Sequence, residues 1–135
     1  MTPQNKRENI REELERGAKS MEAASILAER KYFSDAVSRL YYFVYHTAKA
    51  LLLSEGLEPK SHEGLLRLIG MHFVKTDILS PPDSHIVTRL MKYREEADYN
   101  PSYLFTESDF RGLLDESTNF RDKVMTYLRN QGYIE

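Results

Sequence analysis

The segment between Ser34 and Gly56 most constrains the fold, because its apolar residues recur at three- and four-residue steps over a wide face. These residues are Val37, Leu40, Tyr41, Phe43, Val44, Ala48, Ala50 and Leu51. Such spacing predicts a helix whose apolar face contributes to a protein core. Ser34 is the expected N-cap of this helix, and Gly56 is the expected stop signal.

Apolar residues at helical spacing mark four further segments, and no segment has the alternating pattern of a strand. Ser61 is a plausible N-cap, and Thr106 with Asp109 resembles a capping box. We therefore predict an all-α, up-and-down bundle of four or five helices, formed by one domain spanning residues 1–135. The four additional helices are expected at about residues 4–31, 61–73, 82–99 and 106–132.

The composition is that of an ordinary globular protein, and it narrows the range of functions. The 135 residues include no cysteine, which excludes disulfides and thiolate chemistry and favours a cytoplasmic location. The net charge is −2, so any contact with nucleic acid must be made by a local site. The apolar-rich run at 40–53 is too short and too polar to span a membrane.

The histidines are not arranged as metal ligands. A di-iron helical bundle needs paired Glu-x-x-His motifs, and the chain has none. It also has no glycine-rich phosphate loop. We therefore expect neither a metal nor a cofactor.

A polar stripe shares a helix with the apolar face described above. Arg39, Tyr42, His46 and Lys49 follow one another at steps of three, four and three residues. Arg39 and His46 would lie roughly 10 Å apart along the axis. The arginine could hold a phosphate while the histidine moves a proton. The alternative is that the stripe forms a hydrated contact between helices or subunits.

A second polar group lies at the start of the third predicted helix. Lys60, Ser61 and His62 meet the free amides of a helix N-terminus, where an anion is favoured. The three residues could form a small phosphate site. The alternative is simple capping by Ser61, with two exposed neighbours.

The third polar group interrupts an apolar stripe near the end of the fourth predicted helix. Arg94 and Asp98 are four residues apart, so they can form an ion pair on one face. Tyr99 and Tyr103 follow closely, and their rings could stack on a base. The alternative is an ion pair at the helix end beneath an aromatic cap.

The stretches "SRLYYFVYHTAKALLLSEGLEPKSHEGL" and "YREEADY" together resemble the HEPN superfamily (higher eukaryotes and prokaryotes nucleotide-binding domain), and most of all its small stand-alone prokaryotic branch. The resemblance extends over roughly residues 10–130. It implies a four- or five-helix bundle that is usually a homodimer. Many members are metal-independent RNases whose motif is an Arg followed four to six residues later by His. Many act as toxin and antitoxin with a small nucleotidyltransferase, which in some pairs adds AMP to a Tyr after that His.

Arg94 matches the motif arginine by position, but no histidine follows it, and Asp98 occupies the place at a shorter spacing. Tyr99 or Tyr103 could match the modified tyrosine. A carboxyl group near neutral pH is a poor proton donor, so this departure favours binding over catalysis. Arg39 and His46 have the motif spacing on an earlier helix.

Three functions follow from these observations. The first is a dimeric domain that binds a nucleotide, RNA or a nucleotidyltransferase partner through the polar groups, in a toxin–antitoxin type system. The second is a metal-independent endoribonuclease toxin, with Arg94 or Arg39 stabilising the transition state and His46 or His62 as acid or base. The third is a structural helical dimerisation module. Residues predicted to bind the ligand are Arg39, Tyr42, Lys60, His62, Arg94, Asp98 and Tyr99.

Overall fold

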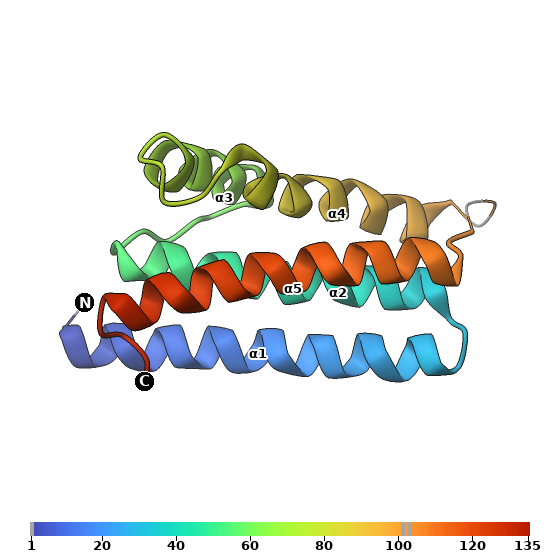
Figure 1. The fold of residues 1–135 in the computed structure, drawn as a ribbon, viewed down its shortest axis with the longest axis horizontal. Coiled ribbons are helices and arrows are strands. Elements are labelled where there is room, and N and C mark those ends of the chain that lie inside the picture. Colours follow the sequence, from blue (N-terminus) through green and yellow to red (C-terminus); the bar gives the residue numbers. More distant parts are fainter. Residues whose placement is uncertain (1, 101, 103) are drawn as a thin grey trace.

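The computed structural model describes residues 2–100, 102 and 104–135. The described residues form five α-helices and one π-helical turn, and none of them lies in a strand. The all-α prediction is confirmed. In chain order the elements are α1 (Pro3–Glu29), α2 (Phe33–Ser54), α3 (His62–Ile69), the π-helical turn η1 (Gly70–Val74), α4 (Pro81–Tyr99) and α5 (Glu107–Asn130) (Figure 1).

Helix α2 is the centre of the bundle, since it contacts α1, α3, α4 and α5. Figure 1 shows α1 running along one side of α2, α5 alongside it and α4 on the opposite side from α1. Leu40, Val44 and Leu51 of α2 are fully buried. The wide apolar face read from the sequence is therefore needed because several helices pack on α2 at once.

The helix ends follow local capping rules at most positions. Ser61 and Thr106 are N-caps whose side chains accept a backbone N–H, and the Thr106 capping box with Asp109 is present. Ser80 and Asp83 form a second capping box, which the sequence analysis did not identify.

The predicted N-cap at Ser34 is wrong, because α2 already begins at Phe33 and Ser34 lies inside it. Lys31 adopts a positive φ of 65°, which reverses the chain in a short turn between α1 and α2. The ring of Phe33 then packs on Phe110 of α5, with centroids 6.3 Å apart. This tertiary contact extends the helix upstream of the residue that best suits a cap.

A glycine brings α1 close to the polar side of α2. A Cβ atom at Gly17 would lie 3.3 Å from the Phe43 carbonyl oxygen and 3.5 Å from the Cβ of His46. A larger side chain there would have to push the two helices apart. Gly17 therefore lets α1 reach the residues of α2 that belong to the polar stripe.

None of the helices in the described part of the chain is long and apolar enough to cross a membrane.

Candidate functional site

Arg94 of α4 lies over two aromatic rings of α2. Its guanidinium carbon is 5.2 Å from the centroid of the Tyr41 ring and 5.9 Å from that of Tyr42. Its Nη1 atom is 3.6 Å from an Asp98 carboxylate oxygen. Its Nε atom is buried and has no hydrogen-bond acceptor among the described residues. The charge of Arg94 is thus held mainly by ring faces and one distant carboxylate.

The electrostatics of this arrangement favour the charged arginine. Burial alone would lower the pKa of Arg94, but Tyr42, Tyr41 and Asp98 outweigh it and keep that pKa above its usual value. The Arg94 side chain is 17% exposed, so it is not fully closed off from solvent.

His62, the first residue of α3, also contacts Tyr41. Its ring stacks on those of Tyr41 and Tyr45, with centroids 5.5 Å and 4.9 Å away. Its Nδ1 atom forms a hydrogen bond with the Tyr41 hydroxyl. Burial and the nearby charge of Arg94 lower the pKa of His62, so its imidazole is neutral at pH 7. Arg94 and His62, far apart in sequence, therefore meet at one tyrosine.

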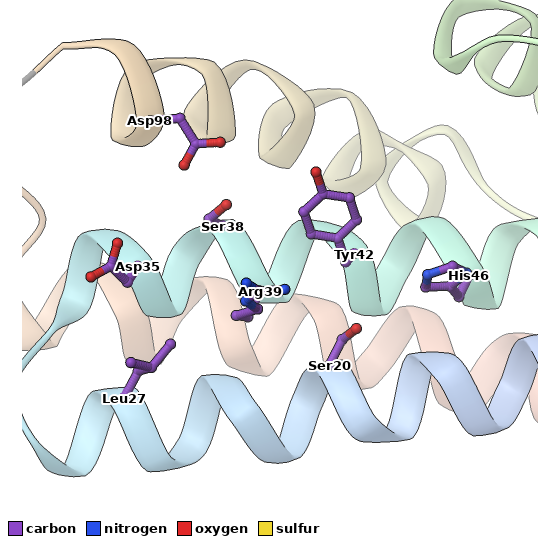
Figure 2. A pocket seen from close by; sticks show the side chains of 8 residues that line it. All are labelled: Ser20, Leu27, Asp35, Ser38, Arg39, Tyr42, His46 and Asp98. Carbon is purple, nitrogen blue, oxygen red and sulfur yellow. The ribbon is translucent and has the colours of Figure 1, made fainter.

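A polar groove of about 480 Å³ opens beside these residues, and Arg39, Tyr42, His46 and Asp98 are among its lining side chains. Figure 2 shows Arg39, Tyr42 and His46 along α2, with Asp98 of α4 on one side of them. The guanidinium carbon of Arg39 is 5.9 Å from the Tyr42 ring centroid. Arg39 and Arg94 thus both lie next to Tyr42, each 5.9 Å from its ring centroid.

The polar stripe of α2 has a partner that the sequence analysis missed. Glu13 of α1 is buried, and its carboxylate lies 2.8 Å from His46 Nδ1, 3.0 Å from Arg16 Nη1 and 3.5 Å from Lys49 Nζ. The sequence did contain a sign of this contact, because Glu13 falls between Ile10 and Gly17 on the inward face of α1. A carboxylate at such a position needs cationic partners, and the stripe supplies them.

The remaining predicted residues lie at or near the ends of α3 and α4, and Tyr99 is close enough to Arg94 to raise the pKa of that arginine. Lys60 is exposed just before α3, and Ser61 caps α3 by accepting the Gly64 N–H. Tyr99 is 75% exposed at the end of α4. Tyr103 lies outside the described residues. In the described part of the chain, no three His, Asp or Glu side chains are placed to hold a metal ion.

The closeness of Arg94 to His62 can be measured without knowing the ligand. Replacing Arg94 with glutamine is expected to raise the pKa of His62, because a positive charge that disfavours the imidazolium is removed. An NMR titration of the histidine ring protons would follow this shift. Lys92→Gln, an exposed change on the same helix, is the control and should leave the pKa of His62 in place. An unchanged pKa of His62 in the Arg94→Gln variant would contradict the closeness of Arg94 to His62.

Comparison with known proteins gives a consistent assignment. Residues 10–128 match the HEPN domain family. The chain is 35% identical to "Putative toxin MJ0605" of Methanocaldococcus jannaschii over 123 residues, which is 91% of each chain. It is 31% identical to "Putative toxin MJ0142" of the same organism over 122 residues, covering 90% of this chain and 83% of the relative. A "UPF0332 protein" of Thermotoga maritima is 28% identical over 121 residues, covering 89% and 92%.

Proposed function

The chain belongs to the HEPN domain family, and from this premise we propose that it binds RNA or a nucleotide at the surface formed by Arg39, Tyr42 and Arg94. One observation carries the proposal. Two guanidinium groups from different helices lie next to the same tyrosine ring, each 5.9 Å from its centroid.

The chemistry of these three side chains suits a nucleotide. A guanidinium group offers a planar fork of donors that binds phosphate oxygens, and a tyrosine hydroxyl can donate a further hydrogen bond to a phosphate or sugar oxygen. Arg94 keeps donors available, because its nearest Asp98 oxygen, at 3.6 Å, is beyond hydrogen-bond distance. Arg39 is exposed and has no ion pair among the described residues.

The proposal is tested by titrating labelled single-stranded RNA and a fluorescent ATP analogue with the purified protein. Arg94→Ala is expected to weaken binding about 10- to 100-fold, the range for losing a charge-assisted hydrogen bond. If both arginines contact phosphates, the log–log dependence of RNA affinity on salt should have a slope of about −1.4, falling to about −0.7 in Arg94→Ala. Lys92→Ala is the matched control on α4. Saturable binding that survives Arg94→Ala unchanged would refute this site.

A metal-independent ribonuclease is the second candidate, and the meeting of Arg94 and His62 at Tyr41 favours it. A neutral imidazole can accept a proton, and the arginine can stabilise a charged phosphorane-like transition state. Labelled tRNA and mRNA would be incubated with the protein in EDTA. Cleavage that disappears in His62→Ala or His46→Ala would favour this candidate over binding alone, whereas intact RNA would exclude it.

We further propose a role in a toxin–antitoxin type system in the cytoplasm, with a small nucleotidyltransferase as partner. The names of two relatives, each called a putative toxin, support the toxin part of this proposal. In that system, Tyr99 is the proposed site of modification, since it is 75% exposed and five residues beyond Arg94. Incubation with the partner and labelled ATP should label the wild type but not Tyr99→Phe. Labelling of both would place the modification elsewhere.

We also propose that the protein is a homodimer. Tyr32 and Leu104 are 59% and 79% exposed, and we expect the partner subunit to cover these apolar side chains. The α1–α2 turn and the α4–α5 connection lie at the same end of the bundle (Figure 1). Light scattering should give a dimeric mass at micromolar concentration and a monomeric mass for Leu104→Glu. A monomeric wild type would contradict the proposal.

A further inference from the structure

A buried carboxylate holds one nitrogen of a histidine that borders the groove. The Glu13 side chain is 7% exposed, and its Oε2 atom is 2.8 Å from Nδ1 of His46. Its other oxygen is engaged by Arg16 at 3.0 Å and by Lys49 at 3.5 Å. Every polar contact of the carboxylate is therefore with a cation or a ring nitrogen.

The ionisation of Glu13 determines which atom carries the hydrogen in this pair. Burial alone would raise the pKa of Glu13, but the hydrogen bond with His46 and the charges of Lys49, His46 and Arg16 outweigh it and hold that pKa below its usual value. An ionised carboxylate can only accept a hydrogen bond. His46 must then donate from Nδ1, and whenever the ring is neutral its Nε2 carries a lone pair.

Packing also restricts the side chain of His46. Helix α1 passes close to His46 at Gly17. A Cβ atom at Gly17 would lie only 3.5 Å from the Cβ of His46. The Tyr45 ring meets the imidazole edge to face, with centroids 5.2 Å apart. The carboxylate and these contacts together leave the imidazole little freedom to turn over.

The free nitrogen belongs to a side chain that lines the groove. His46 lies at one end of the groove beyond Tyr42 (Figure 2), and Nε2 has no hydrogen-bond partner among the described residues. Asp35 and Asp98 add carboxylate oxygens to the lining. The groove therefore combines one exposed arginine with several acceptors, a set that suits a ligand carrying both an anion and hydroxyl groups.

We infer that Glu13 is a positioning residue that fixes His46 as a hydrogen-bond acceptor, and that His46 Nε2 binds a ribose hydroxyl of the ligand in the groove. This inference rests on the proposed nucleotide- or RNA-binding function and gives it a specificity element. A 2′-hydroxyl distinguishes RNA from DNA. His62 is not fixed as an acceptor in the same way. Its Nδ1 bonds a tyrosine hydroxyl, and because a hydroxyl can donate or accept, this bond does not determine which ring nitrogen carries the hydrogen.

The first part of the experiment needs no ligand. The ¹⁵N chemical shifts of His46 would be measured in uniformly labelled protein, at a pH high enough for the ring to be neutral. The expected result is a protonated Nδ1 and an unprotonated Nε2. In Glu13→Gln the preference should be lost, because an amide can offer either its oxygen or its NH₂ group. A wild-type His46 protonated on Nε2 would overturn the inference.

The second part compares RNA and DNA oligonucleotides of the same sequence by fluorescence anisotropy. The wild type is expected to bind RNA about three- to tenfold more tightly, as one hydrogen bond would give. His46→Phe should lose this preference while keeping its affinity for DNA, and Glu13→Gln should reduce the preference. His85→Phe, at an exposed position on α4, is the control.

The outcomes separate this inference from the proposed function. Equal binding of RNA and DNA by the wild type, or an RNA preference that survives His46→Phe, would overturn the inference and leave the Arg39–Tyr42–Arg94 surface standing. Absence of binding to either oligonucleotide, and to the ATP analogue, would overturn the proposed function itself.

Discussion

Replacing Glu13 with glutamine is expected to lower the free energy of unfolding by about 1.5–3 kcal/mol at pH 7, the range for hydrogen bonds to a charged group. The carboxylate is buried and joins α1 to α2 through His46 and Lys49. Glutamine has nearly the same shape, so the loss should come from the missing charge and not from a cavity. Urea denaturation monitored by circular dichroism would measure the change.

The same substitution should make the free energy of unfolding depend less on pH below pH 7. The folded-state pKa of Glu13 lies below its usual value, so its stabilisation is fully present above the unfolded-state pKa. That stabilisation is lost as the pH falls through the folded-state pKa. Between pH 7 and pH 3 the wild type should therefore lose more stability than Glu13→Gln. The pKa of Asp83 is lowered as well, but it contributes equally to both proteins.

Glu12→Gln is the matched control, because Glu12 is the preceding residue of α1 and is exposed. Its unfolding free energy should stay within about 0.5 kcal/mol of the wild type at every pH. If Glu13→Gln behaved like this control, the cluster around Glu13 would contribute nothing to the fold.

Replacing Phe73 with alanine is expected to lower the free energy of unfolding by about 3–5 kcal/mol, as for other fully buried phenylalanines. Phe73 is 0% exposed in η1, and its ring meets Tyr127 of α5 edge to face at 5.6 Å. Its carbonyl oxygen also accepts the N–H groups of Ile78 and Leu79, which order the chain before α4. The urea midpoint should fall markedly with little change in the slope of the transition.

Met71→Ala tests whether this effect belongs to the buried ring. Met71 lies in the same π-helical turn but is 49% exposed, so its removal should change stability far less. Equal losses for the two variants would indicate that the whole turn is sensitive to substitution.

Much of the fold was predictable because its causes are local. The spacing of apolar residues predicts the helices, and Ser61 and Thr106 were identified as caps because a cap depends on the next three residues. Ser34 failed as a cap because a contact from outside the segment, Phe33 on Phe110, determines where α2 begins. A contact between residues so far apart in the chain leaves no pattern in the sequence around Ser34.

The candidate site was predictable in its parts but not in its assembly. The stripe of Arg39, Tyr42 and His46 follows from helical geometry alone. Its pairing with Glu13, 33 residues upstream of His46, depends on how α1 packs against α2. The sequence indicated this pairing only through the position of Glu13, which shares the inward face of α1 with Ile10 and Gly17.

The sequence by itself determined an all-α bundle and the polar residues that interrupt its apolar faces, because helical periodicity and capping act over a few neighbouring residues. The tertiary structure alone decided that Arg94 lies over Tyr41 and Tyr42, that His62 bonds the Tyr41 hydroxyl and that Arg39 also lies next to Tyr42. Those contacts depend on the crossing and register of α2, α3 and α4, which are set by the packing of the whole core.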